Sequence, residues 1–209
     1  ERLTRYIMSF LGHIAINVSG EVFNFSHLLN ECEVMTPPEY LYRPAMGPFA
    51  PSPSGRADLS DPDRPYMDKF GRNFMRTIHV LRITGRDTRS LSRYLHDRLS
   101  DIHGTPVDPF RPQYYRDFNM FTRNCATIIR DGLRDWGYPA VKGIFPRDMF
   151  TCAQWVFLND AGKRGDITTT SFTMPQLMVP EAPPSAMTPL VNPANRIRRR
   201  KLETGNTGR

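Results

Sequence analysis

The chain has 209 residues. Its three cysteines cannot all pair with one another, which argues against a disulfide-built scaffold, and its nineteen prolines exclude regular structure along the whole chain. The net charge of +7 is not by itself a nucleic-acid signal. Residues 196–209 hold six basic side chains and one acidic one, which leaves only +2 for residues 1–195. No run of about 18 apolar residues and no signal-peptide pattern is visible, so no membrane-spanning helix is predicted. We expect one domain, residues 1–175, and a disordered Pro/Arg-rich tail, residues 176–209.

The first predicted element is a β-hairpin over residues 11–25. An apolar, strand-like run leads to a turn at residues 19–21, and the chain then returns as a second strand. His13 lies on the first strand, and Gly12 before it allows a substrate or another backbone to approach closely. We expect Asn24, on the return strand, to lie beside His13 across the hairpin.

The middle of the chain is predicted to hold an irregular segment, a strand and a helix. Residues 36–66 contain eight prolines and are expected to be an insertion without regular structure. Residues 75–84 have the composition of a strand. A helix capped by Thr88 is predicted to run to about Ile102, because its apolar residues recur at helical spacing.

A second helix, residues 125–136, begins at a cysteine. Asn124 is a strong N-cap residue, which places Cys125 in the first turn, where backbone N–H groups lower the pKa of a thiol. Gly137 is a typical stop for this helix. A third helix is predicted over residues 148–157.

Cys125 has two interpretations. In the simpler one it is a small apolar core residue, since free cysteine is among the most buried residue types. In the functional one it is a nucleophile whose proton is taken by His13, with Asn24 fixing the tautomer of the imidazole. The polar, turn-like residues that precede Cys125 favour the functional interpretation.

The other histidines are weaker candidates. His27 lies close after Asn24 and is the reserve residue for the orienting role. His79 is expected in the core of its strand, whereas His96 and His103 are expected at the surface. The sequence has no Cys-x-x-Cys motif and no Cys/His pair at zinc spacing, so neither a metal nor a cofactor is expected.

Two blocks of this sequence resemble NlpC-type cysteine peptidases. Residues 9–16, SFLGHIAI, and residues 22–25, VFNF, are similar to the Gly-His strand and the following strand of that family. Residues 119–133, NMFTRNCATIIRDGL, resemble the nucleophile helix of its permuted members. These members include a bacterial domain family with an Asn-Cys-Thr-Thr-type motif and, more distantly, the lecithin:retinol acyltransferase group. The histidine precedes the cysteine here, which is the permuted order.

The resemblance implies an α+β, permuted papain-like (NlpC-type) fold, in which the helix bearing Cys125 packs on an antiparallel sheet bearing His13. Asn24 matches the family's third catalytic residue, and Asn124 is the helix cap beside the oxyanion hole. The implied activity is cleavage of bacterial cell-wall peptide through an acyl-thioester. As a conjecture, the chain is exported by a specialised route to a periplasm or a target cell, like secreted antibacterial effectors, with a cognate immunity protein as partner.

Two alternatives to this activity stay open. The same Cys-His site also suits an acyltransferase, a thioesterase or a protein deamidase. The second alternative is a non-catalytic binding protein that holds nucleic acid or another polyanion with residues Arg196–Lys201, which include four consecutive basic residues. Nucleic acid is the weaker partner for this tail, because no aromatic residue is interleaved there to stack on bases.

Overall fold

The computed structural model describes residues 12–27, 29, 32–37, 40, 78–110, 112, 115–161, 167–174 and 190–206. The expectation for the proline-rich segment therefore lies almost wholly outside the described residues. The same holds for the first three residues of the strand expected at 75–84. The described part is a mixed α+β structure, in agreement with the coarse fold class inferred from sequence.

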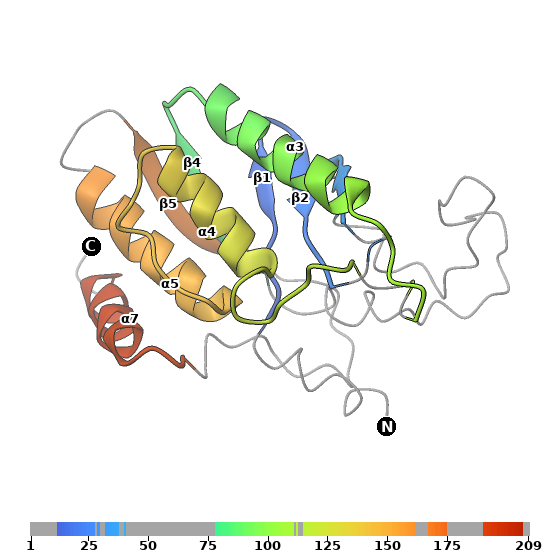
Figure 1. Ribbon diagram of the computed structural model, residues 1–209. Helices are drawn as coiled ribbons and strands as arrows, with labels where there is room; N and C mark the ends of the chain where they lie inside the picture. The colour runs from blue at the N-terminus through green and yellow to red at the C-terminus, as the bar shows by residue number, and fades with distance from the viewer. Residues whose placement is uncertain are drawn as a thin grey trace, which may run out of the picture.

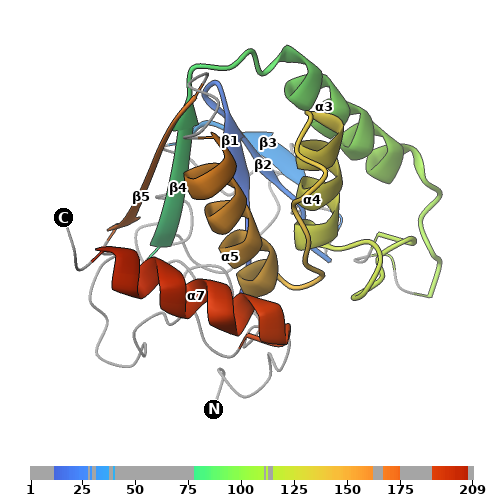
Figure 2. The same cartoon turned by 90° about the vertical axis from the view of Figure 1, so that its left-hand side faces the viewer.

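The described strands form two small antiparallel sheets. β1 (Ile16–Val18), β2 (Glu21–Asn24) and β3 (Glu33–Met35) make one sheet with β2 in the middle. β4 (Ile78–Thr84) and β5 (Thr168–Met174) make the other, with Ile78 opposite Met174. The expected hairpin and the first strand of the second sheet are confirmed, whereas β3 and β5 had no expectation from the sequence. Figure 2 shows the two sheets next to each other, with β4 beside β1.

Three helices lie on one side of these strands (Figure 1). They are α3 (Arg89–Gly104), α4 (Cys125–Asp135) and α5 (Pro146–Val156), and α5 continues as a short π-helix, η4 (Phe157–Ala161). All three expected helices are confirmed, and Thr88 takes the N-cap position of α3 as expected, but its side chain does not cap the helix. The Thr88 side chain makes no capping hydrogen bond, because its hydroxyl pairs with the hydroxyl of Ser19 at 2.8 Å, and Asp87 accepts the N–H of Arg89 instead.

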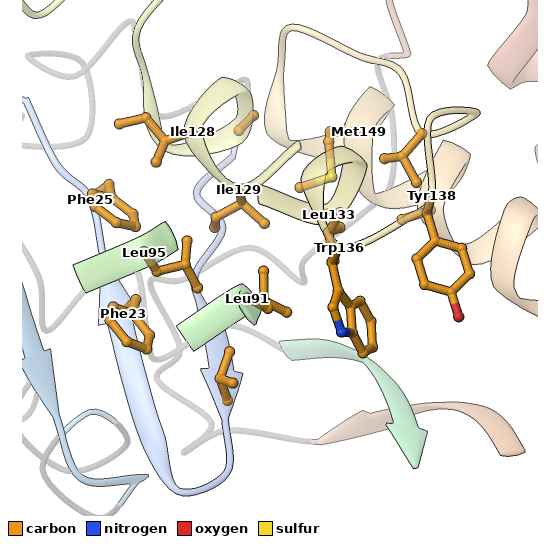
Figure 3. Packing of buried hydrophobic residues seen from close by; sticks show 14 of the residues in the cluster. Phe23, Phe25, Leu91, Leu95, Ile128, Ile129, Leu133, Trp136, Tyr138 and Met149 are labelled. Carbon is orange, nitrogen blue, oxygen red and sulfur yellow. The ribbon is translucent and has the colours of Figure 1, made fainter. Parts of the chain in front are cut away.

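The core lies between the β1–β2 hairpin and helices α3 and α4. Figure 3 shows Phe23 and Phe25 of the hairpin facing Leu95 of α3 and Ile129 of α4. Gly132 lets the two helices approach closely, since a Cβ there would lie 3.0 Å from a ring carbon of Tyr94. This packing fixes the start of α4 relative to the hairpin.

The expectation of a disordered tail is wrong for residues 193–206. They form helix α7 (Pro193–Asn206), which packs beside α5 (Figure 2). The anchor is Asp148, which is 2% exposed and whose carboxylate accepts the N–H groups of Val191 and Asn192 and the side-chain amide of Asn195. A basic, proline-flanked sequence has too little apolar surface to indicate this docking, because its buried contacts are mostly polar. Residues 176–189 and 207–209 lie outside the described part.

Candidate active site

Asn124 caps α4 as expected and forms a complete capping box. Its backbone is extended, and its side-chain oxygen accepts the N–H groups of Ala126 at 2.8 Å and Thr127 at 3.0 Å. The Thr127 hydroxyl in turn accepts the N–H of Asn124 at 2.8 Å. The first turn of α4, which carries Cys125, is therefore held by local hydrogen bonds.

The amide nitrogen of Asn124 ties α4 to two neighbouring segments. It donates to the carbonyl oxygen of Met120, in the loop before α4, and to that of Ile144, just before α5, at 3.1 Å. Asn124 is 7% exposed, so a buried side chain organises three segments around the residue that follows it. Sequence analysis predicted the cap but not these two bonds.

Cys125 is partly buried, and its environment favours the thiolate. Burial raises the pKa of the thiol. The charge of His13, a hydrogen bond from the His13 side chain, and the N–H groups of Ile14 and Ala126 outweigh that effect and lower the pKa below its usual value. The structure therefore brings the predicted cysteine and histidine together across more than a hundred residues of chain.

His13 lies in extended chain just before β1 rather than within it, which corrects the expected strand position. The β1–β2 register pairs Ile16 with Phe23, and no paired residue precedes Ile16 on β1. The ring of His13 is nevertheless fixed, because its Nε2 lies 2.6 Å from the side-chain oxygen of Asn24, which is 1% exposed. An amide oxygen only accepts, so Nε2 carries the proton and Nδ1 is left for the thiol.

Gly12 positions His13 by a backbone conformation that favours glycine. Its φ is +86°, and a Cβ at this position would lie 3.5 Å from the side chain of Arg147 and 3.8 Å from that of Pro146. Gly12 therefore lies against side chains from the start of α5, at ordinary contact distance. No backbone atom is among these nearest neighbours, so the close approach of another backbone at Gly12 stays a prediction.

Two tyrosines near Cys125 were missed by sequence analysis. Burial and then the charge of Cys125 raise the pKa of Tyr40. Burial and neighbouring charges, including Cys125, also raise the pKa of Tyr115, whose hydroxyl donates to the carbonyl oxygen of Arg123 at 2.7 Å. Tyr40 belongs to the proline-rich segment, where neither spacing nor periodicity gives a signal.

The remaining candidates lie elsewhere. The ring of His27 packs near Phe118, with centroids 5.9 Å apart, and Asn24 occupies the orienting position beside His13. His96 and His103 are exposed, as expected, whereas His79 on β4 is only half-buried. Cys32 and Cys152 are both buried, and no cluster of three metal-ligating side chains occurs among the described residues.

Within the described part of the chain, no helix has the length and apolar character needed to cross a membrane. Comparison of the chain with protein-family models, with curated proteins and with solved structures finds no match. The site must therefore be interpreted from its own geometry.

Proposed function

We propose that this chain is a cysteine-dependent amide hydrolase that acts through an acyl-thioester. The observation that carries the proposal is the contact of three residues from separate segments. Cys125, at the start of α4, receives a hydrogen bond from the His13 side chain, and His13 is bonded to the buried Asn24. A nucleophile, a base and a group that orients the base are the minimum set for this chemistry.

The first half-reaction forms the acyl-enzyme. Nδ1 of His13 takes the proton of the Cys125 thiol, which gives a thiolate that accepts a hydrogen bond from the charged ring. The sulfur then attacks the substrate carbonyl, whose π electrons move to oxygen. Asn124 accepts the N–H groups of Ala126 and Thr127, so we assign the N–H of Cys125, in the same turn, to the oxyanion. As the C=O bond re-forms, the C–N bond breaks and His13 protonates the leaving nitrogen.

The second half-reaction releases the acid. His13 takes a proton from a water molecule that attacks the thioester carbonyl, and the C–S bond breaks to return the thiolate. In both halves the side-chain oxygen of Asn24 accepts a hydrogen bond from the Nε2–H group of His13. This bond keeps the ring oriented and stabilises it when it is charged.

At the level of fold and substrate, the proposal is a permuted papain-like enzyme that acts on bacterial cell-wall peptide. Its support is the order of the site residues along the chain, together with a helix N-terminus that carries the cysteine and a hairpin strand, β2, that carries the asparagine. The histidine lies just before the first strand of the same hairpin. The cell-wall substrate rests on the sequence resemblance alone.

The test is incubation with purified peptidoglycan, followed by mass analysis of the released fragments. Wild type should release fragments with a newly formed carboxylate, and Cys125→Ala should release none. Cys152→Ala is the matched control, since Cys152 is buried in α5, and it should retain the activity below its melting temperature. Equal release by wild type and Cys125→Ala would overturn the proposed function.

A negative result with peptidoglycan would leave the same site to be tested on other acyl groups. Thioester hydrolysis, transfer to an added amine and ammonia release from glutamine distinguish the thioesterase, acyltransferase and deamidase alternatives. In each assay Cys125→Ala is again the control, because all of these reactions pass through the same sulfur.

A further inference from the structure

Two exposed apolar side chains belong to the segments before α4 and before α5, both of which are bonded to the side chain of Asn124. Phe121 is 54% exposed and Ile144 is 42% exposed. Phe121 also packs edge-on against the ring of Phe145, with centroids 6.1 Å apart. We call Phe121, Ile144 and Phe145 the apolar rim.

The apolar rim is fixed to the start of α4 by Asn124. The amide nitrogen of Asn124 donates to the carbonyl oxygens of Met120 and Ile144, which are the neighbours of Phe121 and Phe145 in the chain. Figure 1 shows the loop before α4 and the first turn of α5 meeting at the same end of α4. The rim therefore exists before any substrate arrives, held by two partly buried hydrogen bonds.

The rim also reaches the histidine side of the site. Residues 144–147 run from the amide of Asn124 to the backbone of Gly12, where Pro146 and Arg147 lie within 4 Å of the Gly12 Cβ position. His13 is the next residue. The segment that contributes Ile144 and Phe145 thus borders both the nucleophile and its base.

Exposed apolar side chains are unremarkable when scattered singly, but not when they gather beside a reactive thiol. Other large exposed apolar side chains among the described residues belong to other elements, such as Phe172 on β5 and Ile197 on α7. Substrate sites combine an apolar lining with a few fixed polar groups. Here the polar groups are those of Cys125, His13 and Asn24.

We propose that the apolar rim binds a hydrocarbon chain on the acyl side of the substrate, so that the preferred substrate carries an aliphatic group next to the scissile carbonyl. This inference rests on the proposed function, because it takes Cys125 as the atom that is acylated. It departs from the cell-wall peptide implied by resemblance, since a polar peptide would leave Phe121 and Ile144 in water.

The test measures alkylation of Cys125 by iodoacetamides, in which the thiolate displaces iodide and forms a C–S bond. Three reagents are compared: iodoacetamide, N-octyl iodoacetamide, and a reagent of matched length with an oligoethylene glycol chain. Rates at Cys125 are read by peptide mass mapping and divided by the rates of the same reagents with free cysteine. Wild type should prefer the octyl reagent by about tenfold, the factor expected when about two methylene groups leave water.

The double variant Phe121→Ser/Ile144→Ser should lose most of this preference. Phe172→Ser is the matched control, because Phe172 is 44% exposed on β5, and it should keep the wild-type ratio. An octyl preference that survives in the double variant, or a preference for the glycol chain, would overturn the inference.

The outcomes also separate this inference from the proposed function. If Cys125 reacts with iodoacetamide faster than free cysteine but shows no octyl preference, the nucleophile stands and the role of the rim is overturned. If Cys125 is slower than free cysteine with every reagent, the proposed function is overturned and the inference with it.

Discussion

Helices α4 and α5 begin in similar ways but put their N-termini to different uses. Each has 11 residues and follows a residue in extended conformation, Asn124 or Phe145. Each carries a group suited to the positive end of a helix dipole, the Cys125 thiol in α4 and the Asp148 carboxylate in α5.

The surroundings decide the difference. The carboxylate of Asp148 is 2% exposed and accepts three N–H groups from the segment that leads into α7. At α4 the capping is done by Asn124, and the Cys125 sulfur faces His13. One helix start is a structural anchor and the other carries the proposed nucleophile, although the electrostatic reason for an anion there is the same.

The largest expected effect is a loss of hydrolysis, caused by a substitution at the start of α4. Cys125→Ala should lower hydrolysis by about a thousandfold or more, because it removes the nucleophile and leaves only binding and oxyanion stabilisation. Its melting temperature should stay close to that of wild type, since Cys125 is only partly buried. The measurements are single-turnover kinetics and thermal unfolding. A variant inactive only because it has unfolded would not support the comparison.

At the α5 end the expected effect is on stability. Asp148→Ala should lower the free energy of unfolding by about 3 kcal/mol, because buried N–H groups of Val191 and Asn192 and the Asn195 amide lose their acceptor. Asp101→Ala is the control, since its exposed pair with Arg98 should contribute less than about 1 kcal/mol.

Urea unfolding measures this loss of stability, and a truncated chain tests whether it comes from the bonds to residues 191–195. In a chain that ends at residue 189, Asp148→Ala should cost less than in the full chain, because the groups that Asp148 accepts from are already absent. Equal costs in the two chains would show that the bonds from Asp148 to residues 191–195 contribute nothing to the stability of the full chain.

A third prediction concerns pH. Because His13 lowers the pKa of Cys125, alkylation of wild type should reach its plateau at a lower pH than alkylation of free cysteine. In His13→Gln the burial that raises the pKa is no longer outweighed by the imidazole charge. The increase of the Cys125 alkylation rate with pH should therefore move to higher pH, and the alkylation rate near neutral pH should fall about tenfold.

His96→Gln is the control for this shift. His96 is exposed and pairs with Glu21 at 3.2 Å, so its removal should leave the pH profile of Cys125 unchanged. Identical profiles for wild type and His13→Gln would contradict the pairing of His13 with the thiol.

The smallest expected effect is at the cap itself. Asn124→Ala should lower the free energy of unfolding by about 1 kcal/mol, through loss of the capping bonds to Ala126 and Thr127. Asn124→Asp retains an acceptor for those bonds but loses the donor to Ile144 and adds a negative charge beside the sulfur. It should therefore be more stable than Asn124→Ala, yet its Cys125 should be alkylated more slowly than in wild type.

The sequence by itself determined the features that depend on local hydrogen bonds and periodicity. Asn124 before Cys125 is a cap whose partners lie two and three residues away, and the hairpin that carries Asn24 closes over a short turn. The helices followed from their apolar spacing. For these reasons the positions of Cys125, His13 and Asn24 could be predicted as a set.

Only the tertiary structure decided the contacts between distant segments. β5 pairs with β4 across more than eighty residues, Tyr40 reaches Cys125 from a segment without periodicity, and Asp148 holds α7 through buried polar groups. The apolar rim likewise exists because the Asn124 amide joins the loops on either side of α4. Polar bonds of this kind have no sequence period, since each depends on one donor meeting one acceptor after the core has packed.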